Sequence, residues 1–267
     1  MRAFGEGGMA RMKQLPWHEA IEQVLRDNGG VASLEVLYRD IAQYRDLTTN
    51  REWKATLRGI LYREMQRKGQ IVRVGLGVFA LRDTLHKRTL FQRLAEGETV
   101  RPQRLSHAEV EGMLLELGNF YGYDTYTADA QKVFDGKPLA SIATLKDLPP
   151  FTFPDLLAQA RQIDVLWFER KPRPFPKFAF EVETTPEFRR ALLRLYQLRD
   201  FDTALYVVAD EAKRTLFEKR LRDEPFYALR HRFAFRSFEE VFRLYQLQVQ
   251  LAQAQAHFFA DRLRPRW

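Results

Sequence analysis

Three carboxylates on two predicted strands are the residues of this sequence best suited to chemistry. Asp164 comes early in the strand-like segment "IDVLWF", and Glu181 and Glu183 alternate with apolar residues in "FAFEVE". Because side chains alternate between the two faces of a strand, Glu181 and Glu183 share one face and repel each other. Either that face is only wetted by solvent, or something positive belongs there.

The turn between the two strands brings these acids together, which favours a cation among them. The proline-rich turn "KPRPFP" is short enough to place the strands side by side, so an acid early in the first lies near acids late in the second. A carboxylate in a strand as apolar as "IDVLWF" is unfavourable unless it meets a cation or donors. Oxygen ligands with a few waters are what Mg²⁺ takes, so the sequence predicts a divalent ion here, Mg²⁺ or Mn²⁺.

The elements around these strands follow a regular order. A helix capped by Ser106 in "SHAEVEGMLLELG" is expected to end at Gly118, and residues 131–161 are predicted to form an irregular insertion. After the acidic strand, "PEFRRALLRLYQLRDF" predicts a helix and "TALYVVAD" a buried strand, which completes a β-α-β unit. A further helix, a last strand "FAFRSF" and a long glutamine-rich helix follow.

This order, together with the pattern Asp followed by Glu-x-Glu, resembles the PD-(D/E)xK nuclease superfamily over residues 106–210. The core of that superfamily is a helix bearing a Glu, a hairpin bearing the Asp and the (D/E)-x-K strand, then a helix and a further strand. The resemblance implies that Asp164 and Glu181 bind the catalytic metal, with the Val182 carbonyl as a backbone ligand. It also implies in-line attack of a water on the phosphorus of a DNA phosphodiester.

The acid on the first helix has three candidates. Glu109 in "SHAEVEG" is the first choice, and Glu111 and Glu116 are alternatives that the sequence leaves open. His107, just before Glu109, is either a contact for the water or a phosphate, or only a surface residue at a helix start.

The chain departs from the superfamily motif at Glu183, where a lysine is usual. A lysine orients the attacking water and offsets negative charge, whereas a second carboxylate accepts a proton from that water or holds a second metal. A minority of the restriction enzymes that this chain resembles use E-x-E in this place. Lys177, at the start of the same strand, is an alternative source of the missing positive charge.

Two arginines follow the acidic strand. Arg190 and Arg194 are four residues apart on the predicted helix, so both can point at a scissile phosphate and bind DNA. Ion pairing with Glu187 and its neighbours is the competing interpretation.

Residues 15–82 show a different pattern, with three predicted helices followed by "QIVRVGLGVFAL", a strand-like segment with glycines at a turn. That is the element order of a winged helix-turn-helix. In the third helix, Trp53, Leu57 and Ile60 fall on one arc, which predicts the core face. The residues on another arc form either a solvated basic face or a face suited to a phosphate backbone or major groove: Arg51, Lys54, Arg58 and Tyr62.

The stretch "ATLRGILYREMQRKGQIVRVGLGVFALRD" resembles the last helix and wing of the HARE-HTH family, and the resemblance covers residues 15–82. Modules of that family are fused to DNA-acting enzymes. The resemblance implies a DNA-binding module that targets the protein and has no chemistry of its own.

Composition narrows the classes of function. The chain of 267 residues has no cysteine, which excludes disulfides, thiolate zinc sites and cysteine nucleophiles. Its 43 Lys and Arg against 35 Asp and Glu give a net charge of +8, which favours a polyanionic partner such as DNA. Neither a run of 18 apolar residues nor a signal-peptide core occurs, so we expect a cytoplasmic protein without membrane association.

The sequence therefore predicts an α/β fold, a mixed sheet with a restriction endonuclease-like core, behind an N-terminal winged helix-turn-helix domain. The expected boundaries are a flexible tail (1–14), a DNA-binding domain (15–82), a linker (83–105) and a nuclease-like domain with a C-terminal helix (106–267).

The predicted function is Mg²⁺-dependent DNA endonuclease activity, restriction-like or modification-dependent. The candidate catalytic residues are Asp164, Glu181, Glu183 and Glu109. A catalytically degenerate nuclease-like domain that serves as a DNA-binding scaffold or regulator is the alternative, and a solvated acidic strand in an unrelated α/β fold is a third. A homodimer is expected if both DNA strands are cut at one site.

Overall fold

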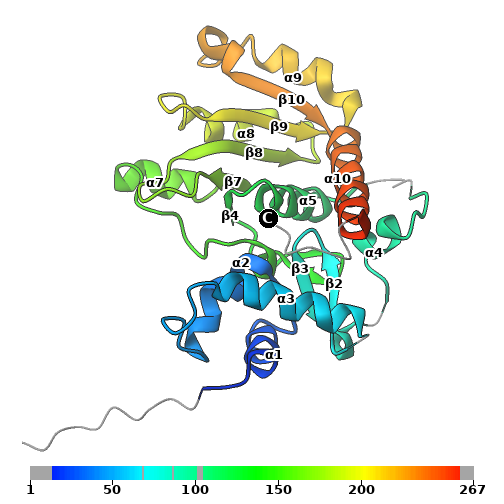
Figure 1. Cartoon of the computed structure of the whole chain (residues 1–267). Helices are drawn as coiled ribbons and strands as arrows, with labels where there is room; N and C mark the ends of the chain where they lie inside the picture. The colour runs from blue at the N-terminus through cyan, green and yellow to red at the C-terminus, as the bar shows by residue number, and fades with distance from the viewer. Residues whose placement is uncertain (1–13, 68, 86, 101–104, 259–267) are drawn as a thin grey trace, which may run out of the picture.

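A five-stranded sheet organises the C-terminal two thirds of the chain (Figure 1). The computed structural model describes residues 14–67, 69–85, 87–100 and 105–258. Strand order is β10-β9-β8-β7-β4, with β8, β9 and β10 parallel and β7 antiparallel to both of its neighbours. The strands are β4 (Asp124–Thr127), β7 (Val165–Phe168), β8 (Pro176–Glu183), β9 (Ala204–Ala209) and β10 (Phe233–Ser237). The fold is thus the mixed α/β type that the sequence predicts.

Helices cover both faces of this sheet, because the strands are apolar on both sides. Trp167 and Phe180 pack toward one helical layer, and Leu166 and Ala179 pack toward the other. The first layer consists of α5 (His107–Phe120) and α10 (Phe238–Phe258). The second consists of α7 (Pro154–Ala160), α8 (Phe188–Tyr196) and α9 (Arg214–Arg220), with the 3-10 turns η3 (Glu211–Lys213) and η4 (Tyr227–Arg232) beside it.

Helix α5 begins at a capping box and extends past its predicted end. The Ser106 hydroxyl accepts from the backbone N–H of Glu109, whose carboxylate accepts in return from the N–H of Ser106. The prediction that Gly118 ends this helix is wrong, because α5 continues to Phe120. A Cβ at Gly118 would lie 2.6 Å from the indole nitrogen of Trp167, so this glycine makes room for a ring of the sheet.

The predicted irregular insertion contains short regular elements. They are β5 (Val133–Phe134), β6 (Lys137–Pro138) and α6 (Leu139–Ile142), followed by α7. Phe134 is fully buried against Gly112 of α5, where a Cβ would come within 2.2 Å of the ring. This contact fixes the start of the insertion beside the first turns of α5.

The N-terminal residues form three helices and a small sheet. The helices are α1 (Trp17–Asp27), α2 (Leu34–Asp40), extended by η1 (Ile41–Gln43), and α3 (Trp53–Gln66). The hairpin of β2 (Ile71–Gly75) and β3 (Val78–Leu81) is joined by a third strand beyond the predicted elements, β1 (Val31–Ser33). Three helices followed by a hairpin agree with the predicted element order. That the module is a DNA-binding winged helix-turn-helix stays a prediction.

The N-terminal module and the sheet domain share one hydrophobic core. Between them lie η2 (Arg82–Thr84) and α4 (Leu90–Ala95), within the segment predicted to be a linker. Phe91 and Leu94 of α4 are buried in a cluster that also contains Val74 of β2 and Met113 of α5. The predicted tail at 1–14 lies outside the described residues except for Gln14.

A buried polar network crosses the same junction. The carboxylate of Glu116, on α5, accepts from the backbone N–H of Leu76 (2.7 Å), the hydroxyl of Tyr245 (2.7 Å) and the ammonium of Lys137 (2.6 Å). Lys137 also donates to the Val74 carbonyl (3.1 Å). All the charged side chains of the network are at most 1% exposed.

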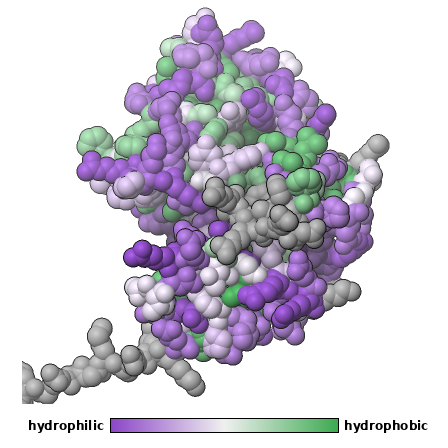
Figure 2. Space-filling view, viewed as in Figure 1, coloured by the Kyte–Doolittle hydropathy of each residue, from purple (hydrophilic) through white to green (hydrophobic). Residues whose placement is uncertain are grey.

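The outer surface over the N-terminal helices is largely hydrophilic (Figure 2). Helix α10 buries Phe242 and Tyr245 and exposes Leu244, Leu247 and Leu251. In the part of the chain that the structure describes, no helix combines the length and the apolar character needed to span a bilayer.

Candidate active site and metal centre

Asp164 and Glu181 occupy neighbouring positions on the β7–β8 hairpin. Val165 pairs with Phe180 in the antiparallel register, so the next residue outward on each strand is an acid. Asp164 is 6% exposed and Glu181 is fully buried. The Asp164 carboxylate accepts from the backbone N–H of Val182 at 2.7 Å, which orients it toward the end of β8. The convergence of these two acids agrees with the hairpin geometry expected from the sequence.

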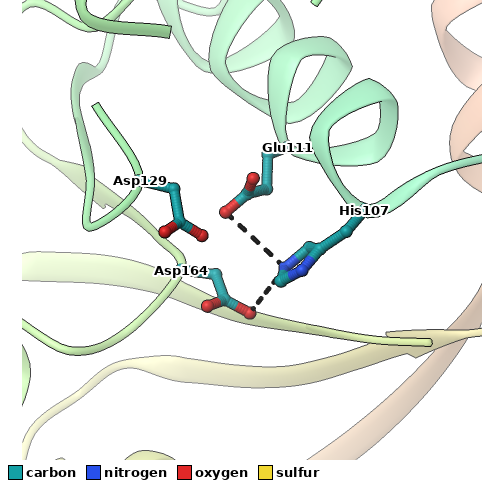
Figure 3. A group of neighbouring side chains, drawn as sticks. All are labelled: His107, Glu111, Asp129 and Asp164. Carbon is teal, nitrogen blue, oxygen red and sulfur yellow. Dashed lines mark hydrogen bonds and ion pairs between the residues drawn. The ribbon is translucent and has the colours of Figure 1, made fainter. Parts of the chain in front are cut away.

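Four potential ligands from three segments, one of them Asp164 itself, converge at the start of β7 (Figure 3). His107 and Glu111 lie one turn apart at the start of α5, and Asp129 follows β4. One ligand atom from each residue lies within 4.8 Å of all the others. His107 Nε2 is 3.2 Å from Asp164 Oδ2 and 3.6 Å from Glu111 Oε1. We call these four residues the acid–histidine cluster.

Glu111 gives the strongest indication that a cation belongs in this cluster. Its side chain is fully buried, and neither carboxylate oxygen has a hydrogen-bond partner. Burial, reinforced by repulsion from Asp129 and Asp164, raises the pKa of Glu111 to about 9. A buried carboxylate beside two other acids and an imidazole matches the oxygen and nitrogen donors that divalent ions take. The residues present therefore fit a divalent metal ion.

Lys132 contributes a positive charge to the cluster. Its ammonium forms an ion pair with Asp129 and lies 3.2 Å from His107 Nδ1 and 3.8 Å from Glu111 Oε2. Burial raises the pKa of Asp129, but the hydrogen bond and charge of Lys132, together with Glu111 and His107, outweigh it and hold that pKa below its usual value. The side chain of Lys132 is 38% exposed, so it lies at the edge of the cluster.

Glu181 has a different partner. Arg194 of α8 donates two hydrogen bonds to the Glu181 carboxylate, and the one from Nε to Oε1 is 2.7 Å long. The hydrogen bonds to Glu181 raise the pKa of Arg194, so the guanidinium stays charged. Both carboxylate oxygens of Glu181 are therefore engaged by a cation of the protein itself. The competing interpretation of Arg194 as an ion-pair partner of Glu187 is not what the structure shows, and DNA binding by Arg194 stays a prediction.

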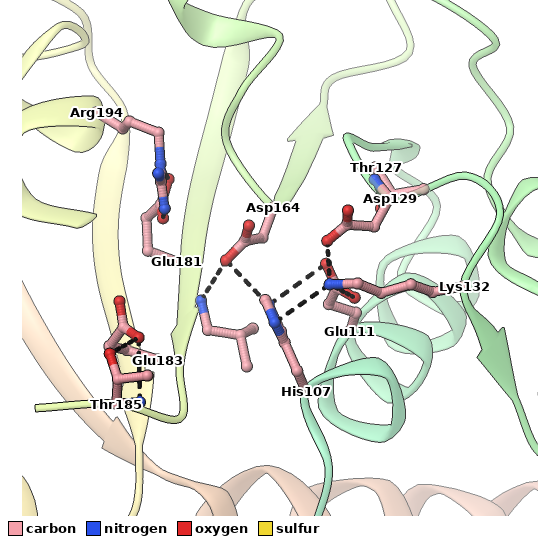
Figure 4. Close-up of polar contacts among 11 residues, drawn as sticks. His107, Glu111, Thr127, Asp129, Lys132, Asp164, Glu181, Glu183, Thr185 and Arg194 are labelled. Atoms are coloured by element: carbon pink, nitrogen blue, oxygen red, sulfur yellow. Dashed lines mark hydrogen bonds and ion pairs between the residues drawn. The ribbon is translucent and has the colours of Figure 1, made fainter. Parts of the chain in front are cut away.

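Glu183 lies at the exposed end of β8, on the side of Asp164 away from the acid–histidine cluster (Figure 4). Its carboxylate accepts from the backbone N–H (3.2 Å) and hydroxyl (2.7 Å) of Thr185. Lys177 is at the other end of β8 and pairs with Asp202 at 2.7 Å, so it does not replace the missing lysine at this site.

The three candidate acids of α5 have separate surroundings. Glu109 is engaged in the capping box, Glu111 faces Asp164, and Glu116 belongs to the network with Lys137. Residues two apart on a helix point about 200° away from each other, so Glu109 and Glu111 cannot share a side. The structure thus places Glu111, one of the two alternatives to Glu109, at the cluster.

Asp129 and Lys132 were missed by sequence reasoning. Both lie where the chain leaves β4 and enters the insertion, which was predicted to be irregular. The available signal is an acid and a lysine three residues apart immediately after a strand. Arg190, predicted to bind DNA with Arg194, is exposed on α8.

The predicted DNA-binding residues of the N-terminal module lie around α3. Arg58 donates to the hydroxyl of Tyr38 at 2.6 Å, and the ammonium of Lys54 lies 5.1 Å from the centre of the same ring. Arg51 is exposed just before the helix, and Tyr62 is partly buried on it. Lys54 and Arg58 of α3 thus both lie against Tyr38, an aromatic residue of α2.

Comparison with known families assigns the sheet domain. A family model described as the type II restriction enzyme NmeDI C-terminal domain matches residues 90–263, more than half of the chain. The chain belongs to this family. The matched region of the restriction-enzyme family runs from α4 through α10 and so includes the whole five-stranded sheet and the acid–histidine cluster. No curated protein and no solved structure matches the chain.

Proposed function

We propose that this protein is a divalent-metal-dependent DNA endonuclease of the restriction type. The observation that supports this most directly is the convergence of buried acids on Asp164, at the end of a hairpin within a restriction-enzyme domain. The PD-(D/E)xK relationship, implied by element order and by Glu-x-Glu on β8, is part of the proposal.

The residues around Asp164 have distinct roles in this proposal. An ion held by Asp164 and the acids beside it would polarise a phosphate oxygen and lower the pKa of a water. The Val182 N–H holds the Asp164 carboxylate in place. Lys132 offsets negative charge from the phosphate, and Glu183, whose carboxylate is held by Thr185, accepts the proton of the attacking water.

The N-terminal module supplies DNA affinity in this proposal. Arg51, Lys54, Arg58 and Tyr62 contact the duplex around α3, and the net charge of +8 favours approach of the polyanion. The shared core between the module and the sheet domain keeps the bound duplex in a fixed position relative to Asp164.

Plasmid cleavage tests the proposal. The pure protein is incubated with supercoiled plasmids, modified and unmodified, in the presence of Mg²⁺ or Mn²⁺. We expect nicked or linear products with the wild-type chain and none with Asp164→Asn, while Glu109→Gln, which keeps the capping box, cleaves normally. Cleavage that survives Asp164→Asn would show that the activity belongs elsewhere or to a contaminant.

A catalytically degenerate DNA-binding scaffold is the second candidate. The observation that favours it is the bidentate pair of Arg194 with Glu181, which occupies the carboxylate that the superfamily uses for its metal. A scaffold would bind DNA without cleaving any plasmid of the panel and would bind no Mn²⁺ in calorimetry.

A further inference from the structure

We infer that the metal ion of this chain is held by the acid–histidine cluster, not by Asp164 with Glu181, and that the cluster prefers a transition-metal ion such as Mn²⁺ over Mg²⁺. The catalytic meaning of this site rests on the proposed endonuclease function. The binding itself rests only on the described side chains.

The spacing of the cluster suits a single ion. Two ligand atoms on an ion with bonds of about 2.1 Å are roughly 3 to 4.2 Å apart. His107 Nε2 lies 3.2 Å from Asp164 Oδ2 and 3.6 Å from Glu111 Oε1. All four ligand atoms lie within 4.8 Å of one another, so small rotations of the side chains complete the set.

Glu111 provides the independent evidence that the cluster binds a cation. A fully buried carboxylate without a hydrogen bond is highly unfavourable unless it meets a positive charge. The nearest nitrogen atoms, His107 Nε2 at 3.6 Å from Oε1 and Lys132 Nζ at 3.8 Å from Oε2, are both too far away for a hydrogen bond. A metal ion between Glu111 and Asp164 would satisfy both carboxylates.

Glu181 is poorly placed to act as a ligand. Arg194 already donates to both of its oxygens, and this pair is enclosed, since Glu181 is 1% exposed and Arg194 27%. Recruiting Glu181 to a metal would require breaking two charge-assisted hydrogen bonds and leaving the guanidinium without its partner. We assign Glu181 and Arg194 to support β8 beside the metal site.

The imidazole determines the class of ion. Carboxylates suit Mg²⁺ and Mn²⁺ alike, whereas a nitrogen ligand favours the transition ions, whose affinity rises from Mn²⁺ toward Zn²⁺ and Cu²⁺. Lys132 touches three of the four ligand residues, so its ammonium competes with an added ion for Asp129 and His107. Removal of this ammonium should therefore tighten metal binding.

Calorimetry and electron paramagnetic resonance on the full chain, without DNA, test the assignment. We expect one Mn²⁺ to bind at least about tenfold more tightly than Mg²⁺. His107→Asn and Glu111→Gln should each weaken Mn²⁺ by at least the roughly 10- to 100-fold that loss of a supporting group costs at metal sites. Lys132→Met should tighten it. Spin-echo modulation of bound Mn²⁺ should show a coupled imidazole nitrogen that disappears in His107→Asn.

Matched variants make the result decisive. Glu109→Gln removes an acid of the same helix turn outside the cluster and should leave Mn²⁺ binding unchanged, and circular dichroism of every variant reports folding. The inference fails if Mn²⁺ does not bind. It also fails if the Mn²⁺ affinity is unchanged in His107→Asn and Glu111→Gln but is lost in Glu181→Gln.

The plasmid assay separates this inference from the proposed function. If the wild-type chain cleaves DNA and its nitrogen coupling is absent, the endonuclease proposal stands and the ligand assignment falls. If Mn²⁺ binds through His107 and no DNA is cleaved, the ligand assignment stands and the endonuclease proposal falls.

Discussion

Glu111 illustrates how a single buried side chain can oppose folding in order to serve a site. Its carboxylate has no hydrogen bond, and nearby Asp129 and Asp164 repel it. We expect Glu111→Gln to raise the free energy of unfolding of the metal-free protein by about 1–3 kcal/mol at neutral pH, because it removes a carboxyl group whose raised pKa makes it take up a proton on folding, and because it adds amide donors for those acids. Urea denaturation in the presence of a chelator measures this change, and plasmid cleavage should be lost.

The matched variant for this prediction is Glu109→Gln, which preserves the capping box and should leave stability within about 0.5 kcal/mol of the wild-type value. A destabilised Glu111→Gln protein would contradict the prediction, since it would mean that the carboxylate has a stabilising partner.

Arg194 presents the opposite case of a charge that the fold needs. Arg194→Met should lower the free energy of unfolding by about 2–4 kcal/mol, because it leaves the buried Glu181 carboxylate without its cation. This loss of stability is no larger than that expected for a fully buried ion pair, because the side chain of Arg194 is 27% exposed. Chemical denaturation measures it, with the exposed Arg190→Met as control. Equal stability of the two variants would show that the pair contributes nothing.

Part of the candidate site could be predicted from the sequence. Alternation along "FAFEVE" and a short turn were sufficient to bring Glu181 near Asp164. The choice of Glu109 over Glu111 was wrong about which helix acid faces Asp164, because it needed the rotational phase of α5, and the capping box sets that phase. Asp129 could not be placed at all, since its position depends on long-range packing of the insertion.

At the scale of elements, two glycines inside helices predict opposite effects of a substitution by alanine on stability. Gly112 of α5 lies against the buried ring of Phe134, where a Cβ would approach to 2.2 Å, whereas a Cβ at Gly59 of α3 would meet nothing within 4 Å. Gly112→Ala should therefore destabilise by about 1–3 kcal/mol through overpacking. Gly59→Ala should stabilise by about 0.5–1 kcal/mol, because alanine is the better helix former.

Thermal unfolding of both variants, followed by circular dichroism, checks this pair. Gly112→Ala should also cleave DNA more slowly, since displacement of the insertion moves Asp129 relative to Asp164. If Gly112→Ala were as stable as the wild type and cleaved normally, the contact with Phe134 would not be what positions the insertion.

For the whole molecule, the polar network around Glu116 predicts cooperative unfolding of the two parts. Lys137→Met should lower the free energy of unfolding by about 3–5 kcal/mol, because the carboxylate of Glu116 is then buried without a cation. Tyr245→Phe, which removes one hydrogen bond, should cost about 0.5–2 kcal/mol.

The measurement is urea unfolding followed by tryptophan fluorescence and by far-ultraviolet circular dichroism. Trp17 and Trp53 report on the N-terminal module and Trp167 on the sheet domain. Coincident transitions are expected for the wild type, since the two parts share a core. Two separate transitions in the wild-type protein would contradict the prediction.

The sequence indicated the order of elements better than their connection. The spacing of hydrophobic residues was sufficient to predict the mixed sheet and the three helices before a hairpin. A charged segment with one glycine and one proline suggested a linker at 83–105, yet Phe91 and Leu94 within it are buried against both parts. Burial of this kind depends on surfaces that come from distant parts of the chain, which local composition does not report.

The position of Tyr245 on α10 has a consequence for biosynthesis. The ribosome releases α5 long before Phe238–Phe258, so Glu116 lacks its hydroxyl donor, and the face of the sheet beside α5 is only partly covered, until α10 emerges. A truncated translation product that ends before α10 would thus leave apolar sheet residues open to chaperones and proteases. For a member of a restriction-enzyme family, this order of assembly would make the folded site depend on synthesis of α10.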